Sequence, residues 1–224
     1  MNKTSIARAI VILHILFRQI EASAQIPAGK EPHHKTVFEN QYIRILDGQI
    51  PVGDTTLVHR HSSSSVVIFL THSTFGIQIL GDTAVIAEVR PGDIKFAGYD
   101  EKPVTHIVWN QGSSLFHFLV VEIVDHPASA DSCRIPPFSG LQNQWQNAQV
   151  KAYVLKFDQG TEYRLQKSAC AFLFIGISGS FESDSSGNTR QIKPNDFIFF
   201  PPQSNIHIKS GRNQNGRGVL LQVR

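Results

Sequence analysis

Three histidines are the side chains best suited to chemistry in this sequence: His59, His61 and His106. His59 and His61 are two residues apart in a segment rich in β-branched residues, which favours a strand. Because side chains alternate between the faces of a strand, both imidazoles are expected on one face, together with Leu57. Two imidazoles on one face can bind a single metal ion. We expect the sheet to curl into a barrel that brings His106 opposite the pair.

Three neutral imidazoles favour a divalent transition metal, and affinity for such ions rises along the Irving–Williams order. Fe, Zn, Mn, Ni and Cu are all compatible with this ligand set. An octahedral ion held by three nitrogens keeps three positions for water, oxygen or substrate. The sequence identifies no further catalytic residue and no site for an organic cofactor.

The elements that must position these histidines are short strands. Turns occur every eight to twelve residues, and no amphipathic helix of useful length is present, which predicts an all-β sandwich or barrel. The turn at Pro91-Gly92-Asp93 is one example, in which Asp93 is expected to cap the turn rather than bind a metal. The strands expected before and after it include residues 42–46, 66–71, 76–80, 83–89, 94–97, 106–110 and 115–124.

The pattern around the histidines resembles the two-part signature of the cupin superfamily over about Thr36–Ile123. Gly53 is followed by five residues and His-x-His, then by Gly92 and by His106-x-x-x-Asn110. The resemblance implies an antiparallel jelly-roll barrel with a metal inside, and some cupin dioxygenases use three histidines on Fe(II). The family's glutamate, four or five residues after the second histidine, is replaced here by Ser65 or Val66.

The chain then repeats itself. Gly160 and the segment Gln166-Lys167-Ser168 occupy the frame of Gly53 and His-x-His, and residues 192–199 echo residues 89–96. His207 falls near the frame of His106, with Gly211 in place of Asn110. The repeat predicts two tandem jelly rolls. Because Gln and Ser are weak ligands beside imidazole, the second barrel is expected to hold no metal and His207 to be packed or hydrogen-bonded.

Composition divides the chain into five segments. They are a signal peptide (1–24), a leader (25–35), an N-terminal barrel (36–125), a linker (126–147) and a degenerate C-terminal barrel (148–224). The leader contains His33 and His34, which we expect to be solvated, as histidines near a terminus usually are. The linker is rich in Pro, Ser, Gln and Asn.

The first 24 residues predict export to the periplasm or the extracellular space. Lys3 and Arg8 precede the apolar run Ile10–Phe17, and Ala22-Ser23-Ala24 offers a cleavage site. The alternative is an unstructured or helical tail. Cleavage removes three basic side chains and one acidic one, which lowers the formal net charge from +3 to +1. No basic cluster then points to nucleic acid or a membrane surface, and no apolar run reaches the length of a membrane span.

Several other side chains invite a functional interpretation that we do not favour. Cys133 and Cys170 can form a disulfide in an exported protein, but two free thiols are the preferred expectation, and neither cysteine belongs to a metal-binding pattern. His72 and His117 are expected at the surface or packed. The loop Tyr99–Lys102 either reaches the barrel mouth or forms a solvated turn, and the turn is preferred.

Two classes of function remain open. The first is a metal-dependent enzyme of the dioxygenase type acting on a small organic molecule, although a three-histidine zinc site can instead generate hydroxide. The second is a non-catalytic module that binds a small molecule and has a decayed metal site. Both have a small-molecule partner, neither involves nucleic acid or, after signal removal, a membrane, and a homodimer is possible.

Overall fold

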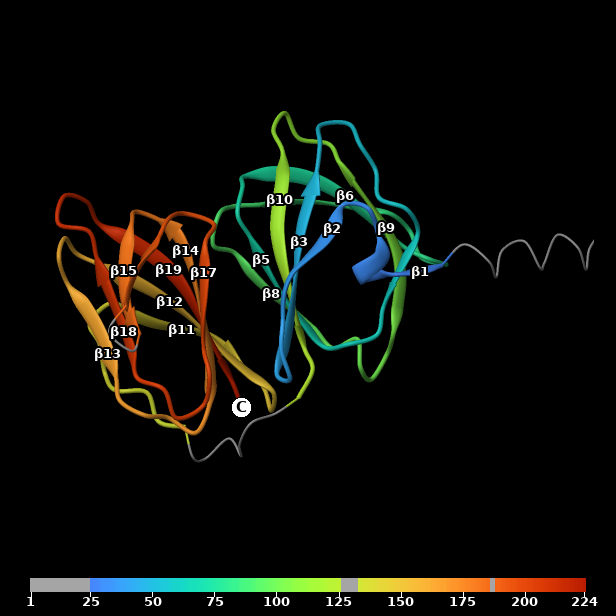
Figure 1. The fold of residues 1–224 in the computed structure, drawn as a ribbon. Coiled ribbons are helices and arrows are strands. Elements are labelled where there is room, and N and C mark those ends of the chain that lie inside the picture. Colours follow the sequence, from blue (N-terminus) through green and yellow to red (C-terminus); the bar gives the residue numbers. More distant parts are fainter. Residues whose placement is uncertain (1–24, 126–132, 186–187) are drawn as a thin grey trace, which may run out of the picture.

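The protein, a computed structural model, is described over residues 25–125, 133–185 and 188–224, and its regular elements are almost all β-strands. The all-β prediction is confirmed. The proposed signal peptide lies outside the described residues. No helix among the described residues is long and apolar enough to cross a membrane. Figure 1 shows the strands gathered into two groups that follow each other in sequence.

The first half contains two five-stranded sheets, in the orders β1-β4-β9-β6-β7 and β2-β3-β10-β5-β8. Neighbouring strands are antiparallel except for β1 and β4, which are parallel. The elements are β1 (Ile26–Pro27), the 3-10 helix η1 (Ala28–Lys30), β2 (His34–Glu39), β3 (Ile43–Ile50), β4 (His59–His61), β5 (Ser65–Phe69), β6 (Ser73–Ile79), β7 (Val85–Val89), β8 (Ile94–Ala97), β9 (Val104–Asn110) and β10 (Phe116–Ile123).

The described strands of the second half repeat this order, and none of them is a counterpart of β1. Its sheets have the orders β11-β12-β19-β14-β17 and β13-β18-β15-β16. The elements are β11 (Leu141–Gln146), β12 (Val150–Phe157), β13 (Glu162–Leu165), β14 (Ala171–Ser178), β15 (Phe181–Ser185), β16 (Asn188–Ile192), β17 (Phe197–Phe200), β18 (Ile206–Ser210) and β19 (Gly216–Val223).

Buried apolar side chains form three clusters. One fills the interior of the first half and includes Leu46, Phe116 and Val120. A second fills the interior of the second half with many aromatic rings. The third joins side chains from both halves, such as Val121 and Leu221, so it lies between them. Residues on one face of each central strand therefore pack into the interior of their own half. Residues on the other face pack between the two halves and hold them together.

Two segments differ from the sequence-based expectation. Residues 25–35, expected as a leader, form β1, η1 and the start of β2, and Ala28 is buried in the interior of the first half. Residues 141–146, expected in the linker, form β11, which pairs with β12. Neither segment has a strong alternating pattern, so the pairing partner decides its conformation rather than local propensity.

The two cysteines are paired, and the expectation of free thiols was wrong. Cys133 and Cys170 form a disulfide with their Cα atoms 5.7 Å apart. Cys170 is buried in the second interior, and Cys133 packs against the same cluster. The bond therefore fixes the chain before β11 to the second half. Spacing in sequence carries no information on this distance.

The turn that precedes β8 has a close counterpart before β17. Gly92 and Asn195 both have positive φ, 83° and 73°. Asp93 Oδ2 accepts a hydrogen bond from the Arg90 backbone N–H, and Asp196 accepts one from Lys193 in the same way. Asp93 is thus a turn cap, as predicted.

Candidate metal centre

The structure brings the three predicted histidines together. In the antiparallel pair of β4 and β9, His59 stands directly across from His106. His106 therefore lies opposite the pair, as expected, and it does so from the neighbouring strand of the same sheet. Leu57 was expected beside the pair, but it precedes β4 and is 53% exposed.

The three imidazoles are spaced as ligands of one ion. Their ligand atoms all lie within 4.8 Å of one another, and all three side chains are buried. The Nε2 atoms of His59 and His106 are 2.9 Å apart. Two nitrogens at right angles, each about 2.1 Å from a shared ion, would be separated by roughly 3 Å. The residues present therefore fit a transition metal.

Backbone contacts orient the ring of His59. Its Nδ1 lies 2.8 Å from the Leu57 carbonyl oxygen and donates to it. That bond leaves Nε2 with the lone pair a metal requires, in the arrangement common for metal-binding histidines. The Nδ1 atoms of His61 and His106 are buried and have no hydrogen-bond partner.

Burial keeps these rings neutral. It lowers the pKa of His61 to about 2, with smaller contributions from His106, His59 and His34. It lowers the pKa of His106 to about 3, again mainly by desolvation. The pKa of His59 is also lowered by burial, although the Leu57 carbonyl and Glu31 oppose the shift. Neutral imidazole is the form that binds a metal.

No carboxylate stands at the position of the family's glutamate. Ser65 is fully buried on β5, and its Oγ donates to the Ser63 carbonyl. Val66 faces the cluster between the halves. The motif residue Asn110 has a structural role, because its Nδ2 donates to the carbonyls of Ile50 and Ser114. It thereby holds the end of β9.

A small cavity of about 70 Å³ adjoins the histidines. Its wall is mainly apolar and is formed by His34, His61, Val67, Phe69, Tyr99, His106, Val108, Phe116, Phe118 and Val120. The ring of Tyr99 lies 5.3 Å from that of His61. The expectation of a solvated turn was therefore wrong for Tyr99, whereas Asp100, Glu101 and Lys102 are exposed.

His34 is the residue that the sequence interpretation missed. It was expected to be solvated, yet it is only 5% exposed. Its ring centroid lies 4.8 Å from that of His59 and 6.0 Å from that of His61. The only sequence signal was the histidine itself, because its burial depends on the pairing of β2 with β3.

The remaining described histidines outside the leader bind carboxylates, as their expected surface or packed positions allow. His72 contacts Glu88, and His117 Nε2 lies 2.6 Å from Asp47. His207 contacts Asp184 and Glu162. None of them belongs to the three-histidine cluster.

No family model matches the sequence, and no curated protein matches it. Solved structures do match. AerE from Microcystis aeruginosa superposes with a TM-score of 0.62 at 14% identity, over 87% of this chain and 98% of that one. A mutant salicylate 1,2-dioxygenase from Pseudoaminobacter salicylatoxidans in complex with gentisate gives 0.64 at 11%, over 95% and 80%. A cupin 2 conserved barrel protein from Leptotrichia buccalis gives 0.57 at 11%, over 89% and 98%. This chain has the cupin fold.

In the second half of this cupin fold, the residue that corresponds to His106 is displaced by one position from the predicted residue. Phe75 pairs with Asn110, and Phe181 pairs with Ser210 in the same place. Four residues before Ser210 is Ile206, so Ile206 and not His207 corresponds to His106. Ile206 pairs with Leu165, as His106 pairs with His59. Two aliphatic side chains thus replace the paired imidazoles.

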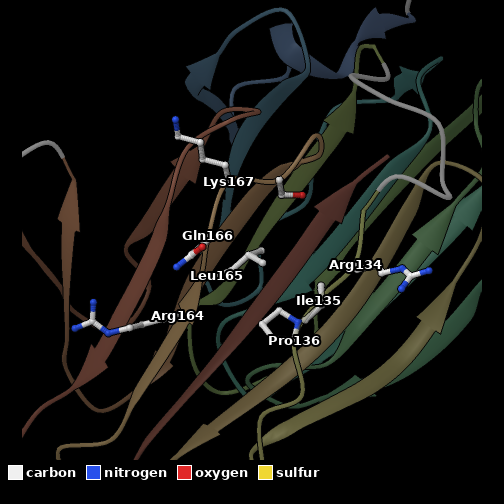
Figure 2. A pocket seen from close by; sticks show the side chains of 8 residues that line it. Arg134, Ile135, Pro136, Arg164, Leu165, Gln166 and Lys167 are labelled. Carbon is white, nitrogen blue, oxygen red and sulfur yellow. The ribbon is translucent and has the colours of Figure 1, made fainter.

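A wide hollow in this second half has a volume of about 650 Å³. Figure 2 shows Arg134 on one side of it and Arg164 and Lys167 on the other. Gln166 and Ser168, the predicted replacements for the metal ligands, also line it. No histidine, cysteine or carboxylate is among the described residues that line it, so it offers no transition-metal ligands.

Proposed function

We propose that this chain is a metal-dependent cupin oxidoreductase, of the dioxygenase type, that acts on a small organic molecule. The observation that carries the proposal is the convergence of three buried, neutral imidazoles with a 2.9 Å separation between two of their Nε2 atoms. His59, His61 and His106 would hold the divalent ion. Such an ion supplies a site at which substrate and oxygen bind and are activated.

The surrounding residues determine what reaches that site. The wall of the cavity is formed mainly by valine and phenylalanine side chains, which exclude bulk water. Its volume of about 70 Å³ is small beside the roughly 300–1,000 Å³ of most ligand pockets. The part of the substrate next to the ion is therefore small. The neighbour solved with gentisate supports a small organic ligand as a class.

The proposal is tested on protein purified without oxygen. We expect about one divalent transition metal per chain, and oxygen uptake with small diketones or thiols. Flavonols, which are much larger than the cavity, serve as the comparison substrates. A folded protein that contains no metal and binds none when Fe(II), Mn(II), Ni(II) or Zn(II) is added would refute the proposal.

A binding module without turnover is the second candidate. Ser65 at the position of the family's glutamate favours it, because that substitution removes a ligand that other cupin sites retain. Both candidates predict metal and ligand binding. Only the enzyme consumes oxygen or converts the ligand, so product analysis under air separates them.

We also propose that the chain is an exported protein of two tandem cupin barrels, of which only the first holds a metal. The repeated strand order supports the two barrels. The disulfide supports an oxidising compartment such as the periplasm or the extracellular space. Mass spectrometry of the protein from its native host tests export, since the mature chain should begin at Gln25. Sedimentation tests the possible homodimer.

A further inference from the structure

The segment from β1 to the first residue of β2 covers the histidine site. Ile26 in β1 pairs in parallel with His59, and Ala28 is buried in the interior of the first half. This segment places two ionisable side chains, Glu31 and His34, inside the protein. Among the described residues of the second half, no strand corresponds to β1.

Glu31 is a fully buried carboxylate that the backbone holds in place. Its Oε2 accepts a hydrogen bond of 2.7 Å from the His33 N–H, and its Oε1 accepts one of 3.1 Å from the Leu57 N–H. Leu57 is also the residue whose carbonyl orients His59. Burial of a carboxylate is costly unless it is hydrogen-bonded in this way. Glu31 Oε2 lies 3.7 Å from Nδ1 of His34.

His34 lies between Glu31 and the cavity. Its ring contacts those of His59 and His61, and Phe118 packs against it at 5.7 Å. Its buried Nδ1 has no hydrogen-bond partner. Apart from the candidate ligands, His34 and Tyr99 are the only described residues lining the cavity that have a polar side chain.

The second half shows that the fold does not need a histidine at this place. His34 pairs with Gly48 of β3, and Leu141 pairs with Leu155 at the corresponding position of β12. Leu141 packs against the second interior. The half that lacks the paired imidazoles of β4 and β9 therefore also lacks the imidazole of β2. This joint replacement associates His34 with the site rather than with the scaffold.

We propose that His34, which lines the cavity next to the three histidines, contacts and orients the molecule bound beside the ion. This inference rests on the proposed function, because it requires a metal on His59, His61 and His106. The molecule it fits is small, binds the ion through oxygen, and carries a hydrogen-bonding group next to the ligating atom. In the apolar cavity, such a group has few other partners.

The experiment uses the full protein loaded with Co(II), with acetohydroxamate as the probe. This compound is small, chelates metals through oxygen, and carries both a hydrogen-bond donor and acceptors. Its Kd is measured from the visible spectrum of the cobalt ion. The test variant is His34→Leu, which introduces the residue type found in the second half. His117→Leu is the control, since that histidine contacts Asp47 and lies outside both the cluster and the wall of the cavity.

We expect His34→Leu to retain one Co(II) per chain and to raise the Kd of acetohydroxamate about 3- to 10-fold, as loss of one hydrogen bond does. Glu31→Gln should raise it less, because one side-chain oxygen remains to accept from the backbone. His117→Leu should leave the Kd unchanged. An unchanged Kd in His34→Leu would overturn the inference.

Loss of Co(II) from folded His34→Leu would also overturn the inference, because His34 would then be a ligand of the ion. A wild-type protein that binds no metal would instead refute the proposed function itself. If His61→Ala loses Co(II) while His34→Leu binds both Co(II) and the probe normally, only the role of His34 fails. Circular dichroism establishes that each variant is folded.

Discussion

The two halves of the molecule share a strand order but differ in what fills them. The first interior contains four buried histidines next to a cavity. The second is closed by apolar side chains, which include Phe157, Tyr163, Phe172, Phe174 and Phe181. The sheets therefore provide positions, and the side chains at those positions decide whether a half can bind a ligand. Function on this fold resides in the site rather than in the architecture.

The comparison of the two halves also shows the free-energy cost of burying histidines in the first one. Burial disfavours the protonated form of these imidazoles, as the lowered pKa values of His34, His61 and His106 show, and the buried Nδ1 atoms of all three lack a hydrogen-bond partner. Leu165 and Ile206 fill the corresponding positions of the second half without buried polar groups. A metal would offset the cost in the first half by satisfying the ring nitrogens.

The largest effect is expected from removing two ligands. The double variant His59→Ala/His61→Ala should abolish stoichiometric metal binding, because a single imidazole remains of the three. Metal analysis after dialysis measures this. Gln166→Ala in the second half is the control and should leave the metal content unchanged. If the double variant binds as much metal as wild type, the site has been placed incorrectly; if Gln166→Ala loses it, the wrong half was chosen.

The second prediction concerns the pH dependence of the chelator-treated protein. Burial lowers the pKa of His34 to about 4, of His106 to about 3 and of His61 to about 2, and that of His59 is lowered as well. Unfolded histidine titrates near pH ~6.5. Below that pH the unfolded chain takes up protons that the folded protein does not, so the folded state loses stability.

The stabilisation by neutral histidines should thus be complete above pH ~6.5 and decline as the pH falls toward 4. His33 has a raised pKa, through hydrogen bonds to Glu31 and Asp54 that outweigh its burial, and contributes in the opposite sense. Urea unfolding at several pH values measures the slope. The variant His59→Ala/His61→Ala should show a shallower slope by up to two protons. Equal slopes would contradict the assignment of buried neutral rings.

The disulfide is expected to affect only the second half of the molecule. Cys133→Ala/Cys170→Ala should lower the free energy of unfolding by about 2–4 kcal/mol, typical for loss of a native disulfide. The bond lies in the second half, so metal content should not change. Urea unfolding with metal analysis checks both statements. Loss of metal at full folding would show that the second half supports the site in the first.

The sequence was sufficient for most strands of the first half and for the three histidines, because both depend on local patterns. Ile94–Ala97 was predicted with its observed bounds, and the frame Gly53-x₅-His-x-His led directly to the cluster. His34 and Tyr99 could not be found in this way. Their place at the cavity depends on which distant strands pair and on how a loop folds back, and neither is encoded in the residues around them.

In the second half, the predicted counterparts of the metal-binding residues were displaced by one position, and this displacement has a physical reason. From Gly53 to His59 the chain takes six residues, whereas from Gly160 to Leu165 it takes five. A shift of one residue exchanges the two faces of a strand. His207 therefore points outward to Asp184 and Glu162, while Ile206 points inward. Sequence frame alone could not show the missing residue.

The smallest expected effect concerns the position of the family's glutamate. Ser65 is buried on β5, and Phe172 holds the corresponding position on β14. Ser65→Ala removes the hydrogen bond from Oγ to the Ser63 carbonyl. The variant should lower the free energy of unfolding by about 0.5–1.5 kcal/mol and leave metal affinity unchanged. A tenfold weaker metal affinity would instead show that Ser65 supports the ion. The first half would then use a fourth ligand position, and the second half would fill the same position with the ring of Phe172.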